Sequence, residues 1–308
     1  MIQHIPVAFC FDENYAPYAA VATFSLFKSS SSPLKIYWVT TVEDLEKAIF
    51  FQQALKKFNI YPIILTPEVS YFRDWRECRH ITRAAYLRLL LPILINEKKL
   101  IYLDCDMLVQ SDLSELFQVD MTGYLIGGIS DSGGQSTSKI PRQQSDQYIN
   151  SGVLLMDLDG LRKDGFLEKC RSIYEEFHEI IVWSDQCIIN KYAENRKLLI
   201  EPKWNRLIYT HTLNEVQWKE ASLLENSKII HFAGGIKPWQ EWCNPVIADF
   251  WWSFANQLGA PNLNPVKITE IQQALDLASI LDLNERFQDA SYLKNSIIGN
   301  LIDLVNKK

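Results

Sequence analysis

Short apolar runs alternate with longer amphipathic segments through the first part of the chain. Ile5–Phe11, Leu34–Val39 and Ile60–Leu65 are apolar runs of the length that predicts buried strands. Ala16–Lys28 and Thr41–Phe58 have the periodicity and the first-turn residues of helices. Strands that alternate with helices are joined by right-handed crossovers, so the pattern predicts a parallel sheet of the kind that binds nucleotides.

A further apolar run, Lys99–Val109, contains two carboxylates, Asp104 and Asp106. Residues two apart in an extended chain point to the same side, so these carboxylates can converge while Cys105 points away. Like charges repel unless a cation lies between them, and Mg²⁺ or Mn²⁺ prefers oxygen ligands. The run therefore indicates a metal site at a strand end. A turn in which Asp104 is a cap and Asp106 is solvated explains the triplet equally well.

Two helical patterns carry side chains of chemical interest. Thr82–Ile95 contains Arg88 among leucines, and an arginine in such surroundings is usually ion-paired or faces a ligand. A second helix is predicted from Ser184, an N-cap residue, with Asp185 and Gln186 in its first turn. An acid at this position complements the helix dipole. A carboxylate and an amide at an exposed helix start can equally hold sugar hydroxyls.

The middle of the chain predicts two strands around a long polar loop. Gly123–Ser130 and Tyr148–Leu158 are the strands, and residues 131–147 between them are rich in Gly, Ser and Gln. A loop of this length inside a compact domain is typically a lid or a binding loop. Asn150 and Ser151, at the polar entrance of the second strand, would let a ligand approach the backbone closely.

The loop after the first strand carries Asp12, Asn14 and Tyr15. Loops at the carboxyl ends of parallel strands bind ligands, so the two polar residues could read the edge of a base on which the tyrosine stacks. Taken alone, the loop fits ordinary turn and cap residues better.

A glycine-rich turn follows a short strand in Lys228–Trp239. His231 at the strand end could complete a metal site with the two aspartates, although a lone histidine on an apolar strand is more often a core residue. Gly234 and its neighbour expose backbone N–H groups, and Lys237 adds a positive charge, which together suit a diphosphate. From Pro261 onwards the pattern predicts helices appended to the core.

Composition narrows the class of protein. The 308 residues are 47% hydrophobic and 22% charged, which excludes a disordered or fibrous chain. A net charge of −6 argues against nucleic acid as the main partner. The six cysteines are scattered, as expected of reduced thiols in a cytoplasmic protein. We predict neither a secretion signal nor a membrane-spanning segment, and at most peripheral contact with the inner face of the cell membrane.

Several segments, in this order, resemble glycosyltransferase family 8, which includes bacterial lipopolysaccharide and lipooligosaccharide galactosyl- and glucosyltransferases. The resemblance covers roughly residues 6–245. It rests on Phe11-Asp12-Glu13-Asn14-Tyr15, Tyr86-Leu87-Arg88-Leu89, Tyr102-Leu103-Asp104-Cys105-Asp106, Asn150-Ser151-Gly152-Val153-Leu154-Leu155, Ser184-Asp185-Gln186 and His231-Phe232-Ala233-Gly234-Gly235-Ile236-Lys237-Pro238-Trp239.

The resemblance implies a GT-A fold, a mostly parallel α/β sheet flanked by helices, as a catalytic domain of residues 1–260 with a helical extension of residues 261–308. It also implies a UDP-sugar donor, a glycan or glycolipid acceptor, Mn²⁺ or Mg²⁺ as cofactor, and retention of anomeric configuration. The implied site residues fall into four groups: Asp12, Asn14 and Tyr15 on uridine; Asp104, Asp106 and His231 on the metal; Gly234 and Lys237 on the diphosphate; and Arg88, Asn150, Ser151, Asp185 and Gln186 around the sugar, with Asp131 towards the acceptor.

One departure from the family concerns Cys187, because many relatives carry a second acid directly after the Asp-Gln pair. It bears on the identity of the donor sugar more than on the reaction. For catalysis we expect Asp185 and the Gln186 carbonyl to stabilise positive charge on the sugar, with front-face attack by the acceptor hydroxyl. The rival hypotheses are a sugar-nucleotide hydrolase or nucleotidyltransferase, and a nucleotide-sugar-binding scaffold without activity.

Overall fold

The structure is a computed structural model that describes residues 4–68, 72–77, 82–212, 217–218 and 225–306. The chain forms two compact units. One contains residues 1–206 and 228–230, and the other contains residues 207–227 and 231–308.

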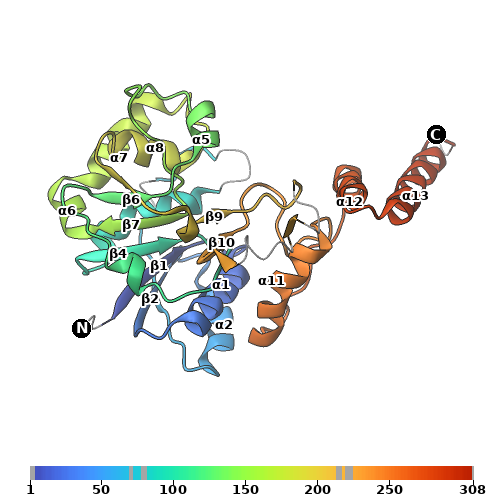
Figure 1. The fold of residues 1–308 in the computed structure, drawn as a ribbon, viewed down its shortest axis with the longest axis horizontal. Coiled ribbons are helices and arrows are strands. Elements are labelled where there is room, and N and C mark those ends of the chain that lie inside the picture. The colour runs from blue at the N-terminus through green and yellow to red at the C-terminus, as the bar shows by residue number, and fades with distance from the viewer. Residues whose placement is uncertain (1–3, 69–71, 78–81, 213–216, 219–224, 307–308) are drawn as a thin grey trace. The chain divides into compact units, whose positions relative to one another are not determined.

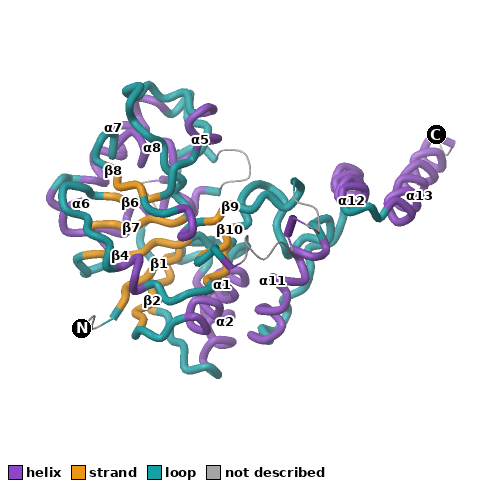
Figure 2. The backbone as a smooth tube through the Cα atoms, viewed as in Figure 1, coloured by secondary structure: helices purple, strands orange, loops and turns teal. Residues whose placement is uncertain are grey.

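Within the described residues, the first unit is built on a seven-stranded sheet in the order β3-β2-β1-β4-β7-β6-β8. Figures 1 and 2 show its central strands side by side. The strands are β1 (Ile5–Cys10), β2 (Leu34–Val39), β3 (Ile63–Leu65), β4 (Lys99–Leu103), β6 (Ile126–Gly128), β7 (Val153–Asp157) and β8 (Lys197–Leu199). Neighbouring strands are parallel except that β7 runs antiparallel to both β4 and β6. The predicted mostly parallel sheet is therefore confirmed.

Both faces of the sheet are covered, because alternate side chains of each strand bury on opposite sides. Ala8 of β1 belongs to a core cluster with residues of the later helices, such as Tyr86 and Ile188. On the other face, Trp38 of β2 donates its indole N–H to Thr23 at 3.0 Å. The helices are α1 (Ala16–Ser29), α2 (Leu45–Lys56), the 3₁₀ helix η2 (Arg83–Leu90), α3 (Leu91–Leu94), α4 (Ser114–Phe117), α5 (Ser132–Thr137), α6 (Leu158–Lys163), α7 (Phe166–Phe177), α8 (Ser184–Tyr192) and the 3₁₀ helix η3 (Pro202–Trp204).

Several predicted strands are shorter than expected. The run Lys99–Val109 breaks at the two aspartates: its first half is β4, and its second half, β5 (Met107–Val109), joins another sheet of order β5-β10-β9. In that sheet β10 is Ile229–His231 and β9 is Arg206–Leu207. The strand predicted over Ile60–Leu65 begins only after Pro62, which has no N–H to donate to a neighbouring strand.

Helix boundaries also differ from the sequence pattern. The pattern over Thr82–Ile95 forms η2 and then α3. Gly165, at a φ of +68°, separates α6 from α7. The segment from Thr41 becomes helical only at Leu45, and the loop of residues 131–147 contains the short helix α5.

The second unit contains α11 (Pro245–Leu258), α12 (Ile271–Leu283) and α13 (Phe287–Asn306), which confirms the predicted C-terminal helices. Helix α12 begins with a capping box between Glu270 and Gln273. The predicted boundary after residue 260 stays a prediction. Among the described helices, none is long and apolar enough to span a membrane. The five described cysteines are buried and free, and Cys78 lies outside the described residues.

The start of α6 offers a test of close packing. A Cβ on Gly160 would lie 2.5 Å from Asp157 Oδ2 and 2.6 Å from Leu125 Cδ2. Asp157 caps the helix by accepting from the Gly160 N–H at 3.1 Å. We expect Gly160→Ala to lower the free energy of unfolding by about 1 to 2 kcal/mol, because the methyl group displaces this cap. Urea unfolding measures the change.

Gly299→Ala is the matched control, since a Cβ at this exposed helical position meets nothing within 4 Å. There the substitution should be neutral or stabilise α13 by up to about 1 kcal/mol. Equal stabilities for the two variants would refute the packing argument.

Candidate functional site

Arg88 is the buried centre of a polar cluster beyond the end of β4. Its Nη2 lies 3.0 Å from Asp104 Oδ1, and its Nε lies 3.2 Å from Asp185 Oδ2. Its Nη1 donates to the carbonyl of Ser151 at 2.8 Å, and its guanidinium lies 4.4 Å from the centre of the Tyr102 ring. Burial alone would lower the pKa of Arg88, but the two carboxylates raise it overall. The charged arginine therefore connects η2 with the residue after β4, with Ser151 before β7 and with the first turn of α8.

Asp185 is almost completely buried at the start of α8. Burial raises its pKa to about 6, although the Arg88 charge opposes that shift. The preceding residue, Ser184, has a φ of +38°, and its Oγ is buried with no hydrogen-bond partner among the described residues. The predicted N-cap role of Ser184 is thus wrong, because Trp183 occupies that position. Backbone strain and buried charge at one helix start are typical of a functional site.

The side chain of Gln186 is held at both ends. Its Oε1 accepts from the Ser151 N–H at 3.0 Å, and its Nε2 donates to Asp131 Oδ2 at 3.2 Å. Asn150 donates to the same Asp131 oxygen at 3.4 Å. Asp131 Oδ1 accepts from the Gly134 N–H at 2.8 Å and so caps α5. The structure therefore brings together four of the six residues predicted around the sugar and towards the acceptor, namely Asn150, Ser151, Gln186 and Asp131.

Asp104, Asp106 and His231 offer ligand atoms that all lie within 4.8 Å of one another. His231 ends β10, whose two preceding residues belong to the first unit. The Tyr102 hydroxyl donates to Asp104 Oδ1 at 2.6 Å, which fixes the orientation of that carboxylate. Two carboxylates and an imidazole form a donor set that suits a divalent ion such as Mn²⁺. The chemistry of this cluster fits the predicted metal.

The loop after β1, which carries Asp12, Asn14 and Tyr15, forms an ordinary turn, one of the two alternatives given by its sequence. Asp12 Oδ1 accepts from the backbone N–H groups of Asn14 at 3.0 Å and Tyr15 at 3.2 Å, and Thr82 donates to Oδ2 at 2.7 Å. Burial raises the pKa of Tyr15, and the carboxylates of Asp106 and Asp12 raise it further. Tyr15 is thus close to the proposed metal ligands, and the uridine roles of this loop stay predictions.

In the second unit, Gly234 and Lys237 have defined local conformations. Gly234 has a φ of +86°, a conformation that favours glycine. Lys237 is only 5% exposed, and its Nζ donates to the carbonyl of Phe232 at 2.9 Å. An ammonium has three N–H donors, so this bond does not by itself prevent a diphosphate contact, and that role also stays a prediction.

Sequence reasoning missed several residues that support the site. Tyr102 could have been found, because it lies two residues before Asp104 and hence on the same side of the strand. Thr82 gave no signal, since its partner Asp12 is 70 residues away. Asn190, which is buried on α8, donates to the carbonyls of Gln186 at 2.9 Å and Ile149 at 2.8 Å.

Comparisons with known proteins identify the fold and the family. The structure resembles the solved structure of the galactosyltransferase LgtC with donor and acceptor sugar analogs, with a TM-score of 0.71, 20% identity, and coverage of 82% of this chain and 96% of that one. This likeness shows the GT-A fold.

Curated relatives include general stress protein A of Bacillus subtilis, 28% identical over 83% of this chain and 96% of the relative. The lipopolysaccharide 1,2-glucosyltransferase of Escherichia coli is 25% identical over 77% of this chain and 73% of the relative. The chain spans less than half the length of several glycosyltransferases of Streptococcus pneumoniae. The family model described as glycosyl transferase family 8 matches residues 6–243. The chain therefore belongs to glycosyltransferase family 8.

Proposed function

We propose that the chain is a retaining hexosyltransferase that moves galactose or glucose from a UDP-sugar to a hydroxyl of a glycan or glycolipid. The observation that carries the proposal is the Arg88 cluster, which links a metal-ligand candidate, Asp104, to Asp185 at the predicted sugar position. Family membership supports the reaction class. The name of the Escherichia coli relative supports a lipopolysaccharide-type acceptor and hexose donor.

Asp104, Asp106 and His231 would hold Mn²⁺ or Mg²⁺, which would offset the negative charge that develops on the UDP diphosphate. Lys237 would add a positive charge there. Arg88 neutralises the two carboxylates that it bridges and so keeps them in place when the donor arrives.

The sugar ring acquires positive charge as its bond to UDP breaks, and Asp185 would stabilise that charge as a carboxylate. Gln186 acts mainly through position: because its Oε1 accepts from Ser151, its amide is oriented towards Asp131. Asp131 would then orient the acceptor hydroxyl for attack on the same face that UDP leaves. Asp185 is paired with Arg88 and nearly buried, which makes it a poor covalent nucleophile. Covalent capture of a sugar on Asp185 or Gln186 would contradict this mechanism.

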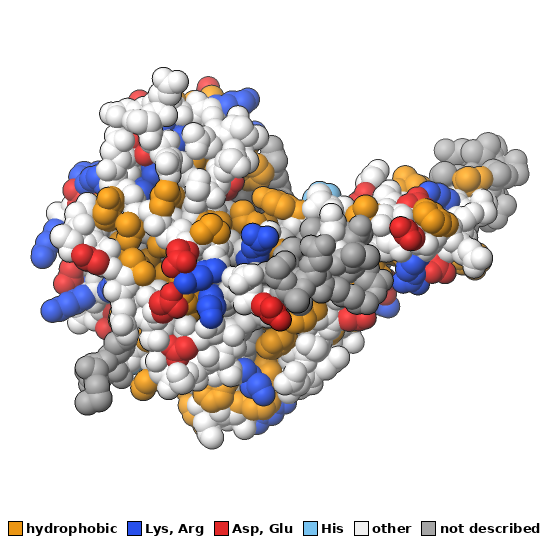
Figure 3. All heavy atoms as spheres, viewed as in Figure 1, with side chains coloured by type: hydrophobic (Ala, Val, Ile, Leu, Met, Phe, Trp, Pro, Cys, Tyr) orange, Lys and Arg blue, Asp and Glu red, His pale blue; other side chains and the backbone are white. Residues whose placement is uncertain are grey.

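The surface is compatible with a sugar-nucleotide enzyme. On the described part of the face in Figure 3, Lys and Arg side chains are interspersed with Asp and Glu, so this face offers no continuous basic surface for a nucleic-acid backbone. We propose a cytoplasmic enzyme whose contact with the membrane, where its glycolipid acceptor would lie, is peripheral.

A donor screen tests the function. UDP-glucose, UDP-galactose and their N-acetyl forms are incubated with Mn²⁺ or with a chelator, with and without an oligosaccharide acceptor, and UDP release is measured. We expect one hexose donor to be turned over only with metal, and Asp106→Asn to lower kcat by roughly a hundredfold or more.

Asp120→Asn is the control for the donor screen, because Asp120 is exposed and, within the part of the chain that the structure describes, its hydrogen bonds are local ones to Thr122. Its activity should equal that of the wild type. Release of UDP at the same rate with and without acceptor would favour a hydrolase, and binding without any release would favour a scaffold.

The pKa of Asp185 predicts an acid limb in the activity profile. Because burial raises this pKa to about 6, the carboxylate is ionised above that pH and protonated below it. We expect kcat to fall about tenfold per pH unit below about pH 6 in the wild type. Asp185→Asn should be much less active and should lack this limb. The measurement is kcat between about pH 5 and about pH 8, and an identical limb in both proteins would exclude Asp185 as its source.

A further inference from the structure

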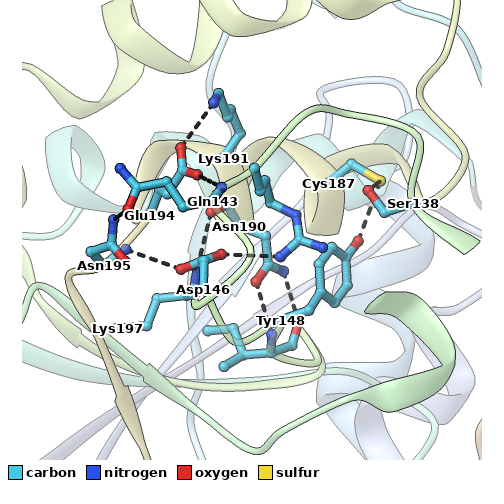
Figure 4. A network of polar contacts seen from close by, with 12 residues as sticks. Ser138, Gln143, Asp146, Tyr148, Cys187, Asn190, Lys191, Glu194, Asn195 and Lys197 are labelled. Carbon is cyan, nitrogen blue, oxygen red and sulfur yellow. Dashed lines mark hydrogen bonds and ion pairs between the residues drawn. The ribbon is translucent and has the colours of Figure 1, made fainter. Parts of the chain in front are cut away.

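The loop predicted as a polar lid contains a buried ion cluster. Asp146 is 4% exposed, and its carboxylate lies 2.6 and 2.7 Å from the Nζ of Lys197 and 3.0 Å from Arg142 Nη1. It also accepts from the backbone N–H of Asn195 at 3.0 Å. Figure 4 shows Asp146 of the loop beside Asn195 and Lys197, the latter being the first residue of β8. The single carboxylate is thus shared by two buried cations.

The cluster continues to the helix that carries the catalytic candidates. The Arg142 guanidinium lies 4.6 Å from the centre of the Tyr148 ring. The Tyr148 hydroxyl lies 3.3 Å from the Sγ of Cys187, and the Ser138 hydroxyl lies 3.7 Å from the same sulfur. Cys187 is 1% exposed and directly follows Gln186. We call Arg142, Asp146, Tyr148, Cys187 and Lys197 the Asp146 latch.

Tyr148, Gln186 and Asp131 also surround one glycine of α5. A Cβ added to Gly134 would lie 2.5 Å from Tyr148 Cε1, 2.9 Å from Gln186 Nε2 and 2.9 Å from Asp131 Oδ2. All three side chains therefore pack against the same backbone position, and Asp131 Oδ1 accepts from the N–H of that glycine at 2.8 Å.

Asn190 connects the residue after Tyr148 to the same helix. Its Oδ1 accepts from the Ile149 N–H at 2.8 Å, and its Nδ2 donates to the Ile149 carbonyl at 2.8 Å and to the Gln186 carbonyl at 2.9 Å. The Lys197 ammonium donates in turn to the Asn190 carbonyl at 3.1 Å. The loop is consequently attached to α8 at both the backbone and the side chains.

We propose that Asp146 and Tyr148 are positioning residues, which fix Asp131 against Gln186 and so set the acceptor side of the site. The proposal rests on the proposed transferase function. It also gives Cys187 a role as the anchor of Tyr148 rather than as a reader of the donor sugar. Loss of the Asp146 charge leaves Arg142 and Lys197 buried without compensation, so the loop must move to solvate them.

Tyr148→Phe is the principal test, because it keeps the ring and removes only the hydroxyl that contacts Cys187. Tyr192→Phe is the matched control, on the helix that carries Gln186 and Cys187: it removes a hydroxyl that donates to Asp164 at 2.5 Å, outside the latch. Transfer to acceptor, UDP release without acceptor, and amide hydrogen exchange of residues 131–151 are measured for both variants and the wild type.

We expect Tyr148→Phe to lower kcat for transfer roughly tenfold or more and to raise the acceptor KM, with the donor KM unchanged. Exchange of the amides of Gly134 and Ser151 should accelerate. Tyr192→Phe should stay within about twofold of the wild type in each measurement, as an independent site would. Cys187→Ser, which keeps a polar partner for Tyr148, should retain activity that Cys187→Ala loses.

Asp146→Asn should give the same pattern more strongly, and Tyr148→Phe keeps the test open if the Asn variant does not fold. If the wild type is active but neither Tyr148→Phe nor Tyr192→Phe changes kcat or amide exchange, the positioning role of the latch is wrong. The proposed transferase function would then still stand. A wild type that releases no UDP from any donor would overturn the proposed function and, with it, the catalytic role of the latch.

Discussion

The buried charge of Arg88 is the interaction on which the rest of the site depends. A guanidinium that is 5% exposed is tolerated only because Asp104 and Asp185 lie against it. Burial raises the pKa of Asp185, and the Arg88 charge opposes that rise. One arginine on a 3₁₀ helix therefore connects the residue after β4 with the first turn of α8.

From this centre, polar contacts extend outwards in two directions. Towards the metal-ligand cluster, Tyr102 and Arg88 both contact Oδ1 of Asp104 among the described residues, so Oδ2 is the oxygen suited to a cation. Towards the acceptor side, the Ser151 carbonyl accepts a hydrogen bond from Arg88, and the Ser151 N–H donates to Gln186. The Gln186 amide donates in turn to Asp131. Ser184, two residues before Gln186, has a positive φ. A backbone conformation of this kind lowers local stability and persists where the surrounding contacts hold it.

The sequence alone predicted the parts of the fold in which burial on both faces leaves an unmistakable apolar run. β1 and β2 are examples, and β2 has the predicted bounds. An apolar run carries no information on direction, however, so the antiparallel course of β7 was not predictable. The late start of β3, by contrast, was predictable from Pro62, because proline has no N–H to donate to a neighbouring strand.

In the candidate site, too, local features were predictable from the sequence and long-range contacts were not. The convergence of Asp104 and Asp106 is local and was predicted from the two-residue period of extended chain. In the structure the two aspartates instead lie in the break between β4 and β5, where their carboxylates still converge. For Arg88 the sequence left an ion pair and a ligand contact open, and the structure shows the ion pair. The pairing of Asp146 with Lys197, which is 51 residues away, could not be read from a segment whose composition predicts an exposed loop. Long-range charge pairing is visible only once the fold brings the partners together.

We propose that Asp104, Asp106 and His231 hold a divalent ion for a UDP donor. An electron paramagnetic resonance titration of Mn²⁺ against the wild type and His231→Ala, each with and without UDP, tests this directly. We expect the wild type to remove the signal of free Mn²⁺, at lower Mn²⁺ concentrations when UDP is present, and His231→Ala to bind the ion much more weakly in both conditions. Undiminished free Mn²⁺ in the presence of wild-type protein and UDP would contradict it.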